Sequence, residues 1–141
     1  MGAGYVAKCH NCGYRSGALM LSGGMLPKWY VAENRLYECS GCKDFVVITE
    51  YMPPESIRKA IQEIQDTGIC NWSGITEEMD NQEIIACITE LIPESEAQQA
   101  QGIACPKCKS IRLKPVDIGS HTKCPKCRRQ KIEFIMDVLW D

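Results

Sequence analysis

The stretch from residue 105 to residue 127, CPKCKSIRLKPVDIGSHTKCPKC, contains the strongest structural signal in the sequence. It begins and ends with a C-P-K-C motif, and the two motifs flank the stretch 109–123 in a C-x2-C-x15-C-x2-C pattern. Two cysteines three positions apart flank a tight turn, a knuckle, that directs both thiolates at one ion. Two knuckles supply the four ligands of a tetrahedral site with Zn–S bonds of about 2.3 Å. This spacing predicts one zinc site made of Cys105, Cys108, Cys124 and Cys127.

A second pair of C-x-x-C motifs lies near the N-terminus. Cys9-His10-Asn11-Cys12 and Cys39-Ser40-Gly41-Cys42 are separated by the stretch 13–38, a gap that can hold a hairpin with an extended loop. The much longer stretch 43–104 separates the two pairs of motifs, which argues against pairing across them. We therefore expect two Zn²⁺ per chain, the second held by Cys9, Cys12, Cys39 and Cys42.

The other two of the ten cysteines, Cys70 and Cys87, lie outside these motifs. We expect both to be small apolar residues, with a ligand or regulatory role as the alternative. A C-x-x-C motif can also be a redox dithiol, but none of the four lies at the start of a helix in a βαβ pattern. His10 and His121 lie near cysteine ligands, and we expect them at the surface or beside a site that four thiolates already fill.

The composition excludes several classes of protein. Of the 141 residues, 45% are hydrophobic and 24% charged, which is typical of a globular chain. No apolar run approaches the roughly 18 residues that a membrane span needs. The first residues lack the basic start, apolar stretch and cleavage site of a secretory signal. We expect a cytoplasmic protein, in a compartment that keeps thiols reduced.

Three segments differ in charge and in pattern. The net charge is +1 over residues 1–52, −8 over 53–100 and +5 over 101–141. The first segment favours strands, with a β-branched and aromatic run over 45–51 that Pro53-Pro54 ends. The last segment alternates apolar and polar residues from Ile132 to Trp140, which indicates a half-buried strand, with a terminal helix as the alternative.

The middle segment has a helical period. Ile57, Ile61 and Ile64 mark one apolar face of a helix that follows Pro53-Pro54 and ends at Gly68. A second helix is expected over about 77–91, ended by Pro93, and residues 95–101 form either a frayed helix or a linker. The fold class is therefore a small, metal-stabilised α+β fold. An N-terminal zinc ribbon (1–52) and a basic C-terminal zinc ribbon (101–141), both antiparallel β, are joined by an acidic helical segment (53–100).

The C-P-K-C knuckles followed by a β-rich tail resemble the zinc-ribbon, or rubredoxin-like, family over 103–134, and more loosely over 6–51. The resemblance implies a three-stranded antiparallel sheet with two knuckles on one zinc, in a family that contacts nucleic acids, docks on proteins or serves as a scaffold. The glycine that often follows a knuckle is present as Gly13 but replaced by Lys43, Lys109 and Arg128. The acidic pair of transcript-cleavage ribbons is missing, since Asp117 stands alone, so that catalytic role is not carried over.

The basic residues of the last segment suggest a binding function. Nine lysines and arginines lie between Cys105 and Lys131 against one acid, and even a −2 charge on the zinc–thiolate centre leaves +6. Such a patch attracts phosphates, although the same lysines can simply offset the thiolate charge. We expect a non-catalytic adaptor that docks on nucleic acid or nucleoprotein. The expected nucleic-acid contacts are Lys107, Lys109, Arg112, Lys114, Lys123, Lys126, Arg128 and Arg129.

Two alternatives stay open. The chain can be a pure protein-interaction adaptor that uses the acidic helices and the loop of residues 25–30, with Trp29 and Tyr30 as partner-binding residues. Less favoured is an iron-binding, rubredoxin-like electron carrier, because four thiolates also hold iron. We expect no enzyme and no small-molecule substrate, since the sequence has no phosphate-binding loop, nucleophile elbow or H-E-x-x-H motif.

Overall fold

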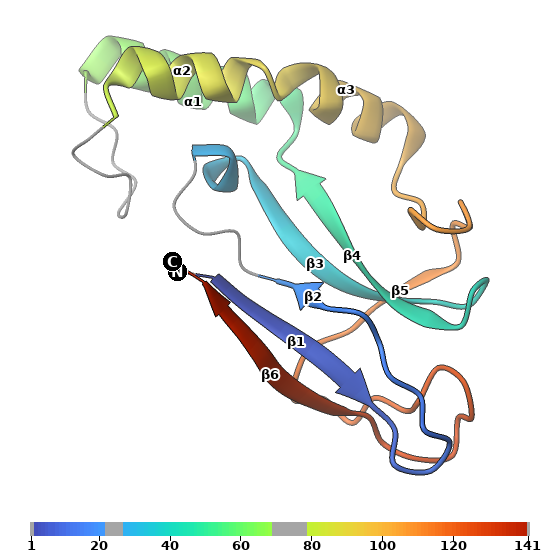
Figure 1. Ribbon diagram of the computed structural model, residues 1–141. Helices are drawn as coiled ribbons and strands as arrows, with labels where there is room; N and C mark the ends of the chain where they lie inside the picture. The colour runs from blue at the N-terminus through green and yellow to red at the C-terminus, as the bar shows by residue number, and fades with distance from the viewer. Residues whose placement is uncertain (1, 22–26, 69–78, 141) are drawn as a thin grey trace. The chain divides into compact units, whose positions relative to one another are not determined.

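The computed structural model describes residues 2–21, 27–68 and 79–140. Two three-stranded sheets and three α-helices make up the described part of the chain (Figure 1). This is a small α+β fold, as the sequence predicts. None of the helices among the described residues has the length and apolar run needed to cross a bilayer.

The first sheet joins the two ends of the chain. It has the order β2-β1-β6, in which β1 (Gly2–Lys8) lies between β2 (Leu19–Met20) and β6 (Glu133–Trp140). β1 and β6 run antiparallel and side by side along their length, from Gly2 opposite Trp140 to Lys8 opposite Glu133 (Figure 1). The strand expected over 132–140 is thus confirmed.

The second sheet has the order β4-β3-β5. β3 (Ala32–Cys39) is followed by β4 (Asp44–Tyr51), as the apolar run over 45–51 predicts. β5 (Leu113–Pro115) pairs antiparallel with β3 and places Leu113 opposite Cys39. Both sheets therefore pair a strand from the first third of the chain with a strand from the last third.

The helices follow the predicted apolar period. α1 (Pro54–Thr67) buries Ile57 and Ile64 and ends at Gly68, whose φ of 66° lets its amide donate to the Ile64 carbonyl. α2 (Asn81–Thr89) buries Ile84 and Ile88, and α3 (Ile92–Gln101) carries Pro93 in its first turn. The expected end of the helix at Pro93 is wrong: α2 stops at Thr89, and Pro93 lies at the start of α3 instead, because proline's fixed φ suits the first turn of a helix. Residues 95–101 are helical.

α2 begins later than the sequence pattern predicts. Asp80 caps the helix: its carboxylate accepts the Glu83 amide, and the Glu83 side chain accepts the Asp80 amide. This reciprocal capping box starts the helix after Asp80. Residues 77 and 78 of the expected helix lie outside the described residues.

Two compact units divide the chain. Unit 1 comprises residues 1–23, 34–49 and 103–141, and unit 2 comprises residues 24–33 and 50–102. Unit 1 therefore contains most of the two segments that the sequence predicts to be separate ribbons. The core of unit 2 consists of Val31, Ile57, Ile64, Ile84 and Ile88.

The core of unit 1 contains cysteines as well as apolar side chains. Phe45 is buried and packs against Phe134 with ring centroids 5.5 Å apart, so the aromatic pair joins β4 to β6. Cys9 and Cys124 belong to this cluster, and Cys39 and Cys105 belong to a second cluster with Tyr37, Val46 and Ile48. Each cluster thus places one cysteine from the start of the chain beside one from its end.

Candidate metal centres

The first group of four cysteines, here called the outer centre, joins the first and last knuckles. Cys9, Cys12, Cys124 and Cys127 have their Sγ atoms within 4.8 Å of one another. The Cys9–Cys127 and Cys12–Cys124 Sγ–Sγ distances are both 3.7 Å. A tetrahedron with bonds of about 2.3 Å has edges of about 3.8 Å, so this arrangement fits one metal ion held by four sulfurs.

The second group, here called the inner centre, joins the two middle knuckles and consists of Cys39, Cys42, Cys105 and Cys108. The Sγ–Sγ distances are 3.5 Å for Cys39–Cys108 and 3.8 Å for Cys42–Cys105. Gly41 is needed for this close approach, because a Cβ there would lie 3.0 Å from the Cys108 sulfur. The inner centre also fits one tetrahedral ion.

The predicted grouping of the knuckles is wrong, although all eight predicted cysteines lie in the two groups. Cys9 and Cys12 do not group with Cys39 and Cys42, and the two C-P-K-C motifs do not group with each other. Strand pairing is the reason. β1 runs into the first knuckle and pairs with β6, which follows the last one, while β3 runs into the second knuckle and pairs with β5, which follows the third. The knuckles are therefore nested: the first and last form one centre, and the second and third, which lie between them in the sequence, form the other.

Burial follows one rule in all four knuckles. The first cysteine of each motif is buried, because it continues a strand or the core. The second is half-buried (Cys42, Cys127) or exposed (Cys12, Cys108). Each centre therefore has two sulfurs in the core and two toward solvent.

The residue after each knuckle has a left-handed backbone conformation, whether or not it is glycine. Gly13, Lys43, Lys109 and Arg128 have φ values of 76°, 50°, 62° and 60°. In three of the four turns the amide of this residue donates to the carbonyl of the first cysteine, as Lys109 does to Cys105 at 2.9 Å. The turn is thus the same with or without glycine, and three basic residues occupy a conformation that is unfavourable for a side chain.

Burial raises the pKa of one thiol in each centre. Desolvation, with further contributions from neighbouring thiols, raises the pKa of Cys42 to about 12 and that of Cys124 to about 11. These two thiols are protonated at neutral pH in the metal-free chain. An incoming cation must therefore displace a proton from each of them.

Hydrogen bonding lowers the pKa of a second thiol in each centre. Backbone donation from Arg129 and side-chain donation from Asn11 lower the pKa of Cys127 to about 6. The Asn11 Nδ2–Cys127 Sγ distance is 3.6 Å. Burial opposes the shift at Cys39, but donation from the Cys42 amide and from neighbouring thiols lowers its pKa to about 7. Each centre thus has one thiolate ready to bind a cation first.

Charged side chains bridge the two centres within unit 1. Asp44, two residues after Cys42, accepts from the Tyr14 hydroxyl and from Lys107 Nζ, the latter at 2.8 Å. Burial raises the pKa of Asp44, but these donors outweigh it and hold the pKa below its usual range. Since Tyr14 follows the first knuckle and Lys107 lies in the third, Asp44 connects the outer centre with the inner one.

Two further contacts cross between the centres. Arg128, after the last knuckle, forms an ion pair with Glu38, whose side chain is 9% exposed. Lys126 Nζ donates to the Cys42 carbonyl at 3.2 Å. Neither Glu38 nor Asp44 was predicted as a site residue from the sequence. Both lie within two residues of a cysteine ligand among many basic residues, which is a signal that the sequence does contain.

The eight expected nucleic-acid contacts are all exposed. Three of them are engaged within the chain: Lys107 with Asp44, Lys126 with Cys42 and Arg128 with Glu38. The other five form no ion pair with any described residue, and neither does Lys131. These six free cations are Lys109, Arg112, Lys114, Lys123, Arg129 and Lys131.

Lys123 and Lys131 are opposite each other across the last knuckle. The Ile132 amide donates to Thr122 and the Cys124 amide donates to Gln130, so the two lysines form a non-hydrogen-bonded antiparallel pair. Side chains in such pairs lie close together, and like charges there are destabilising. The corresponding basic pair at the first knuckle, Lys8 and Arg15, differs because Arg15 faces Asp137 at 3.9 Å.

The remaining predicted residues are not members of either cysteine group. His10 is at the surface and pairs with Glu133, and His121 is exposed. Cys87 is half-buried on α2, while Cys70 lies outside the described residues. Trp29 and Tyr30 lie in η1 (Pro27–Tyr30) and are half-buried. Residues 25 and 26 of the expected partner-binding loop lie outside the described residues.

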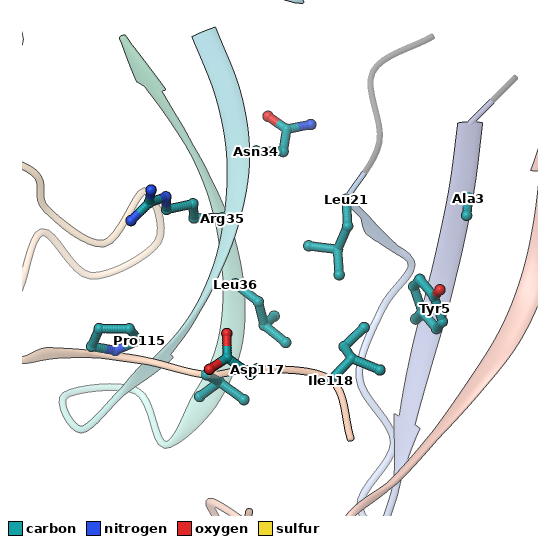
Figure 2. A pocket seen from close by; sticks show the side chains of 10 residues that line it. Ala3, Tyr5, Leu21, Asn34, Arg35, Leu36, Pro115, Asp117 and Ile118 are labelled. Carbon is teal, nitrogen blue, oxygen red and sulfur yellow. The ribbon is translucent and has the colours of Figure 1, made fainter. Parts of the chain in front are cut away.

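Unit 1 also contains a cavity of about 580 Å³. Figure 2 shows Leu21, Leu36 and Ile118 pointing toward one another across it, while Arg35 is turned away. Asp117 lies at its rim, without a second carboxylate in the lining. No cysteine lines the cavity, so it is separate from both centres.

When the chain is compared with protein-family models, with curated proteins and with solved structures, it matches none of them.

Paired substitutions test the nested grouping. We expect Cys12→Ser/Cys127→Ser to disable only the outer centre and leave one ion per chain, whereas Cys12→Ser/Cys42→Ser disables both. None of these three cysteines is fully buried, so serine disturbs the core little. Native mass spectrometry counts the bound ions. If the first double variant binds none and the second binds one, the knuckles pair in sequence order and the nested grouping is wrong.

Substitutions after the knuckles test the left-handed turns. Gly13→Ala has room for its Cβ, so its cost is conformational, about 1 kcal/mol. Lys109→Gly removes that strain and stabilises by up to about 1 kcal/mol, less the entropy that glycine adds to the unfolded chain. Urea unfolding at one fixed concentration of free metal measures both. The same sign for the two variants would contradict this account.

Metal affinity should rise steeply with pH. The Cys42 and Cys124 thiols have pKa values of about 12 and about 11 without metal, so each loses a proton on binding at any pH below these values. Each centre therefore gains at least about tenfold in apparent affinity per pH unit between about pH 6 and pH 8. Competition with a chromophoric chelator across this range measures the slope. An affinity independent of pH would refute the assignment of protonated ligands.

Proposed function

We propose that this chain is a non-catalytic docking protein. Its two four-cysteine centres hold Zn²⁺, and the basic surface of unit 1 binds the phosphate backbone of a nucleic acid or nucleoprotein. The observation that carries the proposal is the pair formed by Lys123 and Lys131, two exposed lysines opposite each other on paired backbone, with no acidic partner among the described residues.

Zinc is the metal that suits a structural role here. Four thiolates fill a tetrahedral coordination sphere and leave no position for water or substrate, so the ion supplies folding energy rather than Lewis-acid chemistry. Iron also binds four thiolates, and an electron carrier is the rival function. A colourless protein with two zinc ions per chain supports the proposal, and a red-brown protein supports the rival.

The charge of unit 1 supports a polyanionic partner. Unit 1 contains thirteen lysines and arginines against six aspartates and glutamates, a net charge of +7, whereas unit 2 carries −9. Two zinc–thiolate centres with a formal charge of −2 each reduce the charge of unit 1 but leave it positive. The overall charge of −2 therefore conceals a strongly basic unit.

The chemistry of the basic surface favours phosphate contacts over base stacking. Residues 105–131 include no phenylalanine, tyrosine or tryptophan on which a base could stack. Lysine and arginine neutralise phosphates and release counterions, which gives affinity that falls as salt rises and depends little on base sequence. We therefore expect weak sequence preference and a strong salt dependence.

Charge reversal at the lysine pair tests this function. Lys131→Glu creates an opposite-charge pair with Lys123, so it should stabilise the fold by about 0.2–1 kcal/mol while weakening polyanion binding. The slope of log affinity against log salt should fall in magnitude by at least about 0.9, the value for one phosphate contact. Fluorescence anisotropy with a short labelled duplex, at several salt concentrations, measures both affinity and slope.

Lys59→Glu is the matched control. It makes the same change in charge at an exposed position on α1 of the acidic unit, and it should leave the salt slope unchanged. If Lys131→Glu and Lys59→Glu weaken binding equally, only net charge matters and no docking surface exists. If the zinc-loaded chain binds no nucleic acid at low salt, the proposed function is wrong.

Protein interaction is the second candidate function, and one observation favours it. Trp29 and Tyr30, the residues expected to anchor a partner, line a pocket in unit 2 together with acidic side chains.

A further inference from the structure

The pocket lined by Trp29 and Tyr30 has the composition of a cation site. It has a volume of about 280 Å³, and its lining includes three aromatic side chains, Trp29, Tyr30 and Tyr51, and two carboxylates, Glu33 and Glu50. All of these residues belong to unit 2. Aromatic faces attract alkylammonium groups through their quadrupole, and carboxylates add direct charge attraction.

The walls of this pocket are held in place by hydrogen bonds from neighbouring backbone and α3. The Met52 amide donates to the Val31 carbonyl at 2.7 Å, which ties the end of β4 to the segment after η1. The Tyr51 amide donates to Gln98 Oε1 at 2.8 Å, and the Ser95 hydroxyl donates to the Met52 carbonyl. A pre-organised pocket loses less entropy when a ligand binds.

An ammonium group from the chain itself already uses one of these rings. Lys28 Nζ lies 4.9 Å from the centroid of the Trp29 ring, within the range of a cation–π contact. Lys28 is not part of the pocket lining. The Trp29 indole thus presents a ring face to a cation in this fold, as the neighbouring pocket would require.

The net negative charge of unit 2 favours a positively charged ligand. Its net charge of −9 attracts cations and repels phosphates, the reverse of unit 1. We propose that this pocket binds the alkylammonium group of a lysine side chain on a partner protein, between the aromatic rings of Trp29, Tyr30 and Tyr51 and the carboxylates of Glu33 and Glu50. This site is independent of the proposed nucleic-acid surface, because it lies in the other unit.

Peptides that differ only at one position test the proposal on the full-length, zinc-loaded chain. The central residue is lysine, trimethyl-lysine or norleucine, which keeps the apolar stem but lacks the ammonium. The reporter is the NMR signal of the Trp29 indole N–H, a buried group without a hydrogen-bond partner among the described residues, assigned with Trp29→Phe. At least one charged peptide should shift this signal and bind about tenfold or more tighter than the norleucine peptide.

Two variants locate the binding energy. Glu50→Gln removes a carboxylate from the lining and should weaken the charged peptide several-fold, whereas Glu90→Gln, an exposed acid outside the pocket in the same unit, should not. Tyr51→Leu removes a ring face while keeping apolar bulk, and should also weaken binding. Circular dichroism verifies that each variant is folded. Duplex binding by unit 1 should be unchanged in Glu50→Gln, which separates this site from the proposed function.

Several outcomes would overturn the proposal. Equal affinity for the norleucine peptide would mean that the pocket is apolar only. Equal loss in Glu50→Gln and Glu90→Gln would mean that the general charge of unit 2 attracts the peptide. Choline binding as tightly as the peptides would point to a small-molecule ligand instead of a partner protein. No shift of the indole signal with any charged peptide would exclude the site.

Discussion

Antiparallel pairing of β1 with β6 organises unit 1. It brings Lys8 opposite Glu133 and so places the first knuckle beside the last. The middle knuckles are then paired through β3 and β5, inside the loop that the outer centre closes. The stretch 50–102, most of unit 2, lies in the sequence between the two knuckles of the inner centre. Each centre takes two cysteines from the first third of the chain and two from the last, so neither end forms a complete four-cysteine centre without the other.

Nesting also suggests an order of assembly. The outer centre alone closes the whole stretch 13–123, between Cys12 and Cys124. Once the inner centre has formed, the flexible chain that remains to be closed shrinks to the stretches 13–38 and 109–123, less than half of that loop. The free-energy cost of closing the loop is smaller by about 0.9 kcal/mol. Formation of the inner centre therefore makes formation of the outer centre less costly. The Tyr14–Asp44 and Arg128–Glu38 contacts add coupling in the same direction, because each joins a residue beside the outer centre to a residue beside the inner one.

Much of the local structure was predictable from the sequence. The eight cysteines, the strand over 45–51, the apolar face of α1 and the alternating strand at the end all follow from spacing and period. The grouping of knuckles was not predictable in this way, since it depends on which strands pair, and short sequence separation favours the wrong partners. The pocket of unit 2 was missed for a similar reason: Trp29 and Tyr51 are distant in sequence and come together only in the folded unit.

The lysines beside the knuckles illustrate how structure resolves an ambiguity of sequence. On charge alone they either offset the thiolates or bind phosphate. The structure divides them. Lys107 pairs with Asp44 beside the same inner centre, and Lys126 and Arg128 contact Cys42 and Glu38 across to the inner centre, whereas Lys123 and Lys131 are opposite each other and form no ion pair with a described residue. Like charges opposed on paired backbone cost stability. A bound polyanion, as we propose, would remove this cost.

The two proposed sites have opposite ligands, and this difference itself restricts the partner. In these proposals the basic unit of +7 would bind phosphates, and the acidic unit of −9, with its aromatic pocket, would bind lysine side chains. A naked nucleic acid offers only the first ligand, and an ordinary protein offers mainly the second. A nucleoprotein offers both on one particle, so two individually weak contacts can act together through effective concentration, provided that one particle can reach both sites. The two units have opposite charges, although the net charge of the chain is only −2. A nucleoprotein is therefore the partner that best fits both proposals.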